Sequence, residues 1–487
     1  MPEEVQKNQA HNHRRVFLET FGCQMNILDS ELVEGQFRAA GYDFVDNADE
    51  ASIVLLNTCS VRDLSEHKVL SRLGRLKERK DKGEQVVVGV LGCMAERSHD
   101  ELAKKKPFID VMVGPSRIHD TLRLIELALK EKSATKKSLS YFVKRKGHKE
   151  SETLSPLDDL EMLDRMRPLE HRSTPWQAYV RITRGCNKFC AFCVVPRTRG
   201  PELHRPPESI IDEVKRLTDS GTQEITLLGQ TINHYHFGNP GKTWSFADLL
   251  WNVHERVPSL KRLRFLTSYP RDFTDDALDV MRDAERICEY LHIPAQSGSD
   301  KVLQDMNRGY DLETYLGLIE RAKSRMPNIS LVGDMIVGFP SETDEDFLKS
   351  VDLLEKVRYK NVFVFKYSPR PNTVAFKRFV DNIPEQIKKL RNNALLAVQN
   401  RIALEHHQKM VGQDFTVLCE GEAKLERDAT ESELISLRTI KSAEVNLTGR
   451  TTGDHIVHFR GPKRLIGSLV NLRIDEARAL SLGGQLI

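Results

Sequence analysis

Short apolar runs alternate with amphipathic stretches through the first 130 residues of the chain. The apolar runs are RVFLETF (15–21), ASIVLLN (51–57), QVVVGVLG (85–92) and VMVG (111–114). They are apolar on both sides, as strands buried between two layers of helices are. Segments with the helical period follow them at 26–40, 64–80, 95–105 and 116–130. This order predicts a parallel, doubly wound α/β domain over residues 14–132, preceded by a disordered tail (1–13).

The same alternation resumes at residue 177 and continues for six units. The apolar runs are QAYVRIT (177–183), EITLLG (224–229), LRFLT (263–267), EYLHIP (289–294), ISLVGDMIVGF (329–339) and NVFVFKYS (361–368). Helical patterns separate them near 208–219, 245–257, 275–286, 311–325 and 343–356, and a longer one covers 385–409. Six successive βα units favour a partial (β/α)6 barrel resembling a TIM barrel, over residues 173–408.

Two further segments break the α/β pattern. Residues 133–172 are first basic and then acidic and irregular, which is typical of a linker, with a phosphate-facing basic stretch as the alternative. After residue 408 the apolar runs become short, β-branched and separated by turns, which predicts a small all-β barrel over 409–475 and a tail over 476–487.

Composition restricts the class of protein. A chain of 487 residues is too long for one compact core, and its formal charge of +3 does not by itself argue for a nucleic-acid partner. No apolar run reaches the roughly 20 residues of a membrane-spanning helix, and the N-terminus has no apolar core of a secretory signal. We therefore expect a cytoplasmic protein without membrane contact. In that reducing setting, clustered cysteines indicate metal ligands or redox groups rather than disulfides.

Three cysteines follow the first predicted barrel strand in RGCNKFCAFCVVP (184–196). Cys186, Cys190 and Cys193 have the spacing C-x3-C-x2-C and lie at the carboxyl end of that strand, where barrel folds place their active sites. The spacing fits an iron–sulfur cluster. A zinc site would need a fourth ligand, for which His204 is the nearest downstream histidine, and a thiol redox pair would leave Cys186 without a role.

A second set of cysteines is dispersed through the first domain. Cys23, Cys59 and Cys93 each lie within about three residues of the end of a predicted strand. Because the carboxyl ends of parallel strands line one edge of a sheet, the three thiols are expected to converge on a second cluster. The alternative is three buried cysteines that act as small apolar side chains. Cys288 and Cys419 stand alone and are expected in the core.

With three thiolates on a cluster of four irons, one iron stays open and can bind the amino and carboxylate groups of S-adenosylmethionine. The motif RGCNKFCAFC, with Phe192 before its last cysteine, resembles the radical SAM superfamily. In that superfamily one electron passed to the sulfonium yields a 5′-deoxyadenosyl radical. The resemblance places Phe192 against the adenine, with packing as the alternative.

The motifs FGCQMNILDSE, LLNTCSVRD, VLGCMAER and RGCNKFCAFCVVPRTRG together resemble the methylthiotransferase family. The likeness extends through LLGQT, HIPAQSGSDKVLQDMNRGY and DMIVGFPSETDEDF and covers nearly the whole chain. It implies two [4Fe-4S] clusters, of which the front one handles sulfur and the barrel one generates the radical. It also implies that S-adenosylmethionine is both radical source and methyl donor, and that the last domain is an RNA-binding module of the TRAM type.

The resemblance also suggests further site residues. The alternative for each of them is an ordinary turn or surface residue without a role in the site. Those expected near S-adenosylmethionine, besides Phe192, are Gly229, Gln230, Gln296, Ser297, Val337 and Gly338. Those expected to contact RNA phosphates are Arg197, Arg199, Arg450, Arg460, Lys463 and Arg464, and Arg197 and Arg199 could instead shape the site beside the cysteine triplet. His234 and His236, in NHYHF, lack matching partners for a metal site and are expected on a surface loop.

The sequence most resembles the branch of the family that acts on isopentenylated adenosine beside the tRNA anticodon. A radical can attack carbon 2 of that adenine, whose C–H bond resists acid–base chemistry, and a base in a single-stranded loop is easily unstacked. Alternatives are threonylcarbamoyl-adenosine, an aspartate of a ribosomal protein, or a noncatalytic iron–sulfur RNA-binding protein. The resemblance further implies tRNA as partner, an electron donor such as flavodoxin or ferredoxin, and a monomer. Residues 426–443 appear as an insertion in the last module.

Overall fold

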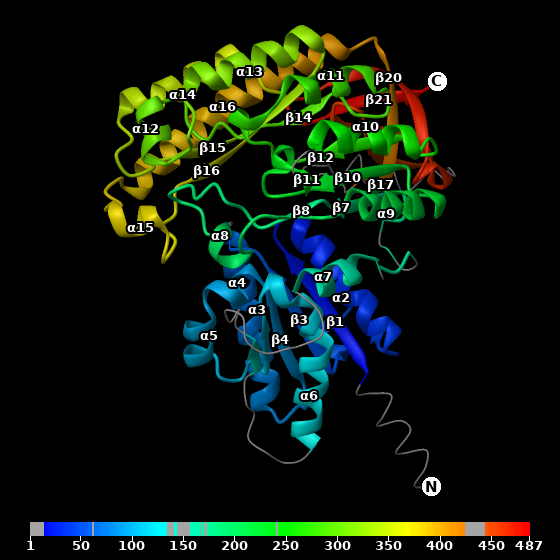
Figure 1. Ribbon diagram of the computed structural model, residues 1–487, viewed down its shortest axis with the longest axis vertical. Helices are drawn as coiled ribbons and strands as arrows, with labels where there is room; N and C mark the ends of the chain where they lie inside the picture. Colours follow the sequence, from blue (N-terminus) through cyan, green and yellow to red (C-terminus); the bar gives the residue numbers. More distant parts are fainter. Residues whose placement is uncertain are drawn as a thin grey trace, which may run out of the picture.

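The structure is a computed structural model that describes residues 14–60, 63–133, 141–143, 156–165, 167–169, 172, 174–239, 242–423 and 444–487. Figure 1 shows an N-terminal α/β domain in blue, a larger α/β domain in green and yellow, and a small C-terminal β domain in orange and red. The segment expected as an insertion, 426–443, and the tail 1–13 lie outside the described residues. None of the described helices combines the length and apolar character needed to cross a membrane.

The N-terminal domain contains a six-stranded sheet in the order β2-β1-β3-β4-β5-β6, with every neighbouring pair parallel. Its strands are β1 (Arg15–Phe21), β2 (Asp43–Phe44), β3 (Ile53–Thr58), β4 (Val87–Gly92), β5 (Val111–Val113) and β6 (Tyr141–Val143). Its helices are α2 (Gln24–Ala39), α3 (Asp63–Asp81), α4 (Cys93–Arg97), α5 (His99–Lys105) and α6 (Thr121–Ser133). The predicted doubly wound parallel domain is therefore confirmed.

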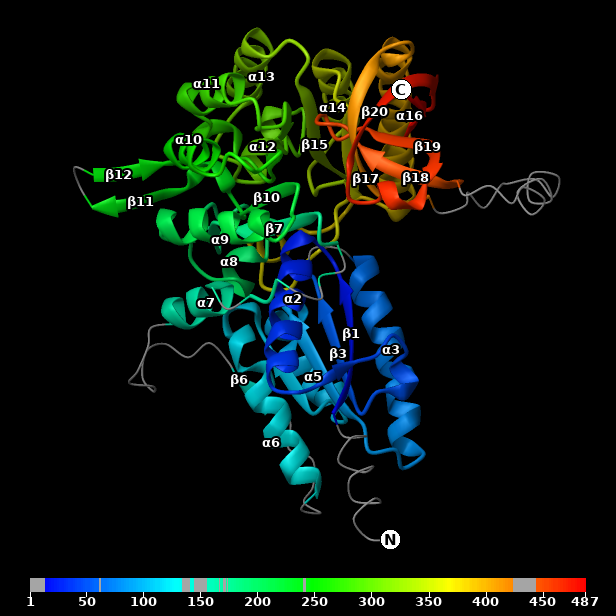
Figure 2. The same ribbon diagram turned by 90° about the vertical axis from the view of Figure 1, so that its right-hand side faces the viewer.

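Both faces of this sheet are covered, which explains why its strands are apolar on both sides. Leu55 of β3 faces one core together with residues of α2 and α6, and its neighbour Leu56 faces the opposite core together with residues of α3 and α5. Figure 2 shows α3 on one side of the sheet and α2 and α6 on the other.

The segment expected as a linker, 133–172, is partly built into the fold. Its described residues include β6, which pairs with β5, and α7 (Pro156–Arg165), which brings the buried Asp164 to the interface between the two α/β domains. The interpretation as a simple connector is wrong for these parts. The sequence misled because the segment is charged, whereas its described residues Glu161, Asp164 and Arg167 form ion pairs with other parts of the fold.

The central domain holds the six predicted parallel strands as two three-stranded sheets, β7-β10-β13 and β14-β15-β16. A bridge between Leu263 and Ile287 connects the two sheets into a partial barrel. The strands are β7 (Gln177–Arg181), β10 (Glu224–Leu228), β13 (Arg262–Phe265), β14 (Tyr290–His292), β15 (Ser330–Val337) and β16 (Asn361–Lys366). The helices are α9 (Pro207–Asp219), α10 (Phe246–Arg256), α11 (Asp275–Asp283), α12 (Asp300–Asp305), α13 (Leu312–Arg325), α14 (Asp344–Val357), α15 (Val374–Arg378) and α16 (Glu385–Met410).

The central domain also contains several short elements that the sequence pattern did not predict. They are β8 (Thr183–Arg184), α8 (Val195–Thr198), β9 (Leu203–His204), the 3-10 turn η3 (Ile232–His234), β11 (His236–Asn239) and β12 (Lys242–Ser245). β8 pairs with β9, and β11 pairs with β12 as an antiparallel hairpin that projects from the domain in Figure 2.

The C-terminal domain is a closed five-stranded barrel in the order β17-β18-β19-β21-β20. Its strands are β17 (Asp414–Glu422), β18 (Glu444–Arg450), β19 (Ile456–Pro462), β20 (Leu469–Ala477) and β21 (Leu482–Leu486). Residues 476–487 were expected as a tail, but β21 closes the barrel, and the prediction of a tail is wrong. LGGQL lacks the β-branched side chains by which a strand is recognised from sequence.

Two buried arginines join the small barrel to the central domain. Arg262 and Arg264 of β13 donate to four main-chain carbonyl oxygens of the C-terminal domain at 2.6–2.8 Å. Cys288 and Cys419 are buried in apolar clusters, as predicted.

Candidate active site with two cysteine triads

The three front cysteines lie at the carboxyl ends of neighbouring parallel strands. Cys23 precedes α2 just after β1, Cys59 follows β3, and Cys93 begins α4 directly after β4. Since β1, β3 and β4 are adjacent in the sheet, the three residues come together at one edge. The three cysteines lie close enough to interact, as expected, while the cluster stays a prediction; we call this group the front triad.

Hydrogen bonds and a nearby cation favour thiolate in part of the front triad. A hydrogen bond with the Cys59 thiol, with a smaller contribution from Arg199, lowers the pKa of Cys23 to about 6 although burial opposes this. Burial raises the pKa of Cys93, while Arg199 and a hydrogen bond with Thr198 act in the other direction. The set of three thiols beside a guanidinium is suited to bind an anionic iron–sulfur group.

Two buried asparagines that the sequence analysis missed hold the front triad in place. The Cys23 thiol donates to Oδ1 of Asn26 at 3.2 Å, and Nδ2 of Asn26 donates to Oδ1 of Asn57 at 3.1 Å. Nδ2 of Asn57 in turn donates to the main-chain oxygen of Asn26 and to the Ser30 hydroxyl. In the sequence, the indication of this role was the position of the two asparagines inside the motifs CQMN and LLNTC.

The second group, the barrel triad, is formed by Cys186, Cys190 and Cys193 on the loop after β8. The amide of Cys186 donates to the Gly200 oxygen at 3.1 Å, and its thiol lies 3.4 Å from the Thr231 hydroxyl. Burial raises the pKa of Cys193 to about 12 and also raises that of Cys186. Such thiols lose their protons when they bind metal, so the donor set fits the expected cluster.

A buried arginine, Arg308, also contacts the barrel triad and was missed by the sequence analysis. Its Nη1 lies 3.2 Å from Sγ of Cys190, and its Nη2 donates to the Pro294 oxygen near the end of β14. Arg308 therefore ties the cysteine loop to a barrel strand and places a positive charge next to a thiol. Its place in the motif DMNRGY was the only signal in the sequence.

A short segment connects the two triads. Thr198, which interacts with Cys93, lies only five residues after Cys193, and the four-residue α8 occupies that interval. Five residues span at most about 18 Å even when fully extended. α8 contacts α4, the helix that begins with Cys93, and Figure 1 shows the two next to each other.

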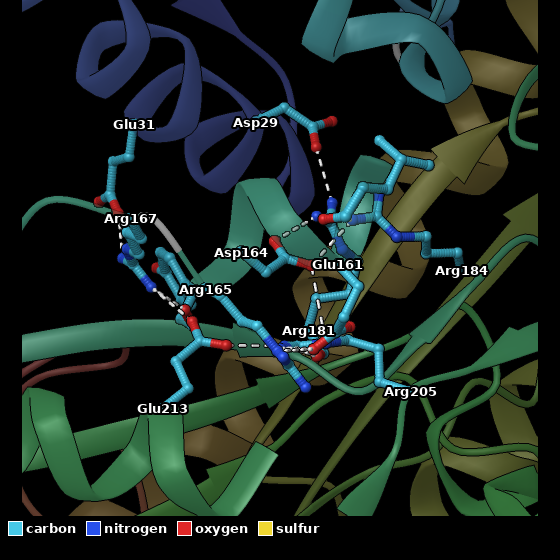
Figure 3. A network of polar contacts seen from close by, with 12 residues as sticks. Asp29, Glu31, Glu161, Asp164, Arg165, Arg167, Arg181, Arg184, Arg205 and Glu213 are labelled. Atoms are coloured by element: carbon cyan, nitrogen blue, oxygen red, sulfur yellow. Dashed lines mark hydrogen bonds and ion pairs between the residues drawn. The ribbon is translucent and has the colours of Figure 1, made fainter. Parts of the chain in front are cut away.

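A buried ion-pair network holds the two domains in this arrangement (Figure 3). Arg181 of β7 is fully buried and donates to Asp29 of α2 at 2.9 Å and to Asp164 of α7 at 2.5 Å. Asp164 also accepts from Arg184 at 2.8 Å, and Asp29 accepts from Arg199 at 3.0 Å. Burial opposes ionisation of Asp164, but its arginine partners lower the pKa of this carboxyl below its usual value. The network connects the N-terminal domain, helix α7 of the segment expected as a linker, and β7, the first strand of the barrel.

The residues expected near S-adenosylmethionine lie at successive strand ends of the barrel. Gly229 and Gln230 follow β10, Gln296 and Ser297 lie beyond β14, and Val337 is the last residue of β15 with Gly338 directly after it. A Cβ on Gly229 would lie 2.3 Å from Oγ1 of Thr183, so close packing requires glycine there. Gln296 has a φ of 76°, an uncommon conformation for a residue with a side chain. Phe192 packs against an apolar cluster that includes Ala191, Met306 and Phe339.

The six arginines and lysines expected to contact RNA fall into two groups. Arg197, Arg460, Lys463 and Arg464 are exposed, with Lys463 paired to Glu422. Arg199 and Arg450 are engaged in the protein instead. Arg199 pairs with Asp29 beside the front triad, and Arg450 pairs with Glu420 and Asp454. Arg199 has a buried carboxylate partner and Arg450 has two half-buried ones, and a contact of either residue with RNA stays a prediction.

His234 and His236, predicted on a surface loop, lie next to a third histidine, His204, which the sequence pattern did not indicate. Ring nitrogens of His204, His234 and His236 all lie within 4.8 Å of one another, and this trio is the compact metal-ligand group found among the described residues. His204 comes from β9, on the neighbouring segment of the chain. The expectation that the pair lacks partners is therefore wrong.

Comparisons with known proteins agree with this architecture. Residues 180–354 match the model of the radical SAM superfamily, and residues 15–114 match that of the uncharacterized protein family UPF0004. A solved radical S-adenosylmethionine methyltransferase, TsrM from Kitasatospora setae, has a similar fold, with a TM-score of 0.50, 14% identity and coverage of 74% of either chain.

Curated relatives extend over nearly the whole chain. The tRNA-2-methylthio-N(6)-dimethylallyladenosine synthase of Rhodopirellula baltica is 42% identical to it, over 97% of this chain and 95% of that protein. The synthase of the same name from Aquifex aeolicus is 39% identical, over 97% of this chain and 99% of that protein. Such a match, with two cysteine triads joined by a short segment, shows that the chain belongs to the family of radical SAM methylthiotransferases named tRNA-2-methylthio-N(6)-dimethylallyladenosine synthases.

Proposed function

We propose that this chain attaches a methylthio group to carbon 2 of isopentenylated adenosine beside the anticodon of tRNA. The observation that carries the proposal is the pair of cysteine triads, separated by a segment that includes α8. A reaction that transfers sulfur to an unreactive carbon needs both a source of radicals and a place to hold sulfur. Relatives at 36–42% identity bear the name of this activity.

The two triads take different roles in this proposal. Cys186, Cys190 and Cys193 of the barrel triad would hold the [4Fe-4S] cluster that works with S-adenosylmethionine, and Cys23, Cys59 and Cys93 of the front triad would hold a second cluster. When bound and reduced by one electron, S-adenosylmethionine supplies a carbon radical able to attack a C–H bond. The chain's own part is to keep both sites dry, to fix their separation and to position the adenine between them.

Charged residues of the chain assist both sites. Arg308 keeps a positive charge at Cys190, and Arg199 keeps one among the front thiolates. Burial alone would disfavour a positive charge on Arg199, but Cys93, Asp29 and Cys23 raise its pKa above the ordinary value. The charge of Arg199 favours the thiolate forms of Cys23 and Cys93, and that of Arg308 favours thiolate at Cys193, which assists cluster binding.

The ends of the barrel strands and the exposed cations serve substrate binding. Phe192, Gly229, Gln230, Gln296, Ser297, Val337 and Gly338 form the surroundings of S-adenosylmethionine. The C-terminal barrel, with Arg460, Lys463 and Arg464, and the exposed Arg197 bind tRNA phosphates. A small electron-transfer protein such as flavodoxin or ferredoxin supplies the electron, and the enzyme works as a monomer.

Anaerobic reconstitution followed by a product assay tests the proposal. The loaded protein is expected to contain about eight irons per chain, four for each cluster, and to convert isopentenylated tRNA to its methylthio form. About four irons and no product would refute it. Mass spectrometry of tRNA nucleosides from a deletion strain, with and without the wild-type gene, identifies the substrate in the cell.

The same experiments decide between this function and its alternatives. Loss of the methylthio form of threonylcarbamoyl-adenosine, or of a modified aspartate in a ribosomal protein, would assign the chemistry to another substrate. A noncatalytic RNA-binding protein would not cleave S-adenosylmethionine after reduction.

A further inference from the structure

The histidine trio lies on three separate short elements that converge beside the barrel triad. His204 comes from β9, His234 from η3 and His236 from β11, and their ring nitrogens lie within 4.8 Å of one another. The rings of His204 and His236 have centroids 4.1 Å apart. Neutral imidazole nitrogens at such distances are the donors that zinc and similar divalent transition metals bind.

Hydrogen bonds orient two of the three rings for metal binding. Nδ1 of His236 lies 2.9 Å from the main-chain oxygen of His234, and because that oxygen can only accept, Nδ1 carries the proton. Nδ1 of His234 lies 2.6 Å from a carboxylate oxygen of Glu202, whose side chain is 1% exposed. In each ring the other nitrogen is then left as a lone-pair donor. A carboxylate behind a histidine is the usual support of a zinc ligand.

The third ring, that of His204, contains a buried nitrogen that is free to bind an ion. Nδ1 of His204 is buried and has no hydrogen-bond partner among the described residues. Burying a polar nitrogen without a partner is unfavourable, and a bound ion would satisfy it. The buried carboxylate of Glu202 supplies negative charge that would partly offset the charge of a cation.

We propose that His204, His234 and His236 bind one divalent transition-metal ion of the zinc class, with Glu202 as the supporting carboxylate. Nitrogens bound to one zinc ion at about 2.0–2.1 Å lie roughly 3.4 Å apart, so the rings need to close by at most about 1.4 Å. Rotation of the side chains allows this, since His236 is exposed. That exposure also leaves a fourth position open to water.

The ion would fix the surroundings of the first cysteine of the barrel triad. Thr231, just before η3, lies 3.4 Å from the Cys186 thiol, and the amide of Cys186 donates to Gly200, four residues before His204. A metal ion that joins residues 202–204 to residues 234–236 would therefore hold in place both segments of the chain that contact Cys186. The three histidines are positioning residues in this proposal and do not take part in the proposed methylthio transfer.

Metal analysis of the full-length protein with both clusters loaded tests the site independently of enzymatic activity. Iron loading is needed because vacant cysteine triads would themselves bind zinc. After zinc is offered and the protein is dialysed, we expect about one zinc per chain by mass spectrometry and nitrogen–oxygen ligation by X-ray absorption. Failure to retain zinc, or sulfur ligation, would overturn the proposal.

Single variants locate the ion. His236→Gln and His204→Gln are expected to lose the bound zinc, and Glu202→Gln to weaken it by about 10–100-fold, with the iron content unchanged in each. His67→Gln, which changes an exposed histidine of α3, is the matched control and keeps one zinc. His236 is exposed, so its variant retains the fold. Zinc retained by His236→Gln at wild-type affinity would refute the site.

Discussion

The buried carboxylate of Asp164 offers a direct test of how the two domains are held together. Asp164 is 1% exposed and accepts from Arg181 at 2.5 Å and from Arg184 at 2.8 Å, with Arg205 3.6 Å away. Asp164→Asn keeps the shape of the side chain and removes its charge. Removal of one partner from a buried ion pair typically costs about 3–5 kcal/mol.

We expect a loss near the lower end, about 3 kcal/mol, because the partners of Asp164 are not equally affected. Arg181 keeps Asp29, and Arg205 keeps Glu161 and Glu213. Arg184 loses the carboxylate to which it is hydrogen-bonded. Asp414→Asn is the matched control, since its partner Arg473 is 59% exposed and such pairs contribute about 0.2–1 kcal/mol.

Urea unfolding of the two variants and the wild type measures these differences. The partners of Asp164 lower its pKa in the folded state, so its contribution is present above the unfolded pKa of about 3.9 and is lost as the pH falls below it. The destabilisation is therefore expected to be constant between about pH 5 and pH 7 and to shrink in more acidic solution. Equal effects of the two substitutions would show that the buried network does not hold the domains together.

Three further predictions concern the clusters and the RNA. Cys190→Ala is expected to lose the barrel cluster and S-adenosylmethionine cleavage but to keep the front cluster, leaving about four irons per chain; loss of both would show that the sites depend on each other. Arg308→Gln removes a unit charge close to Cys190, so redox titration should give a more negative reduction potential for the barrel cluster. The shift is on the order of 100 mV for a charge about 6 Å from the cluster at an effective dielectric constant of about 20. An unchanged potential would contradict the role assigned to Arg308. Arg464→Ala is expected to weaken tRNA binding and to reduce the slope of log affinity against log salt by about 1, as measured by filter binding, and an unchanged slope would exclude a phosphate contact.

The cysteine chemistry could be predicted from the sequence because it depends on local spacing and on strand order. Cys186, Cys190 and Cys193 lie within eight positions, so the triad is visible in the motif itself. Cys23 and Cys59 lie far apart, but each follows a strand that reads as buried and parallel. In such a sheet the carboxyl ends must share one edge, and hydrophobic periodicity alone therefore predicted the front triad.

Tertiary structure decided the features that depend on side chains from distant segments. Arg181 and Asp29 are 152 residues apart, and no local pattern indicates that they pair. For the same reason no local pattern indicated that Arg199 pairs with Asp29, and the segment that contains Asp164 was interpreted as a linker. His204 joins the other two histidines only because β8 pairs with β9 and brings its segment alongside η3. Polar pairing at long range leaves no periodicity in the sequence, so the arrangement of the two triads, their supporting cations and the histidine trio emerged only from the fold.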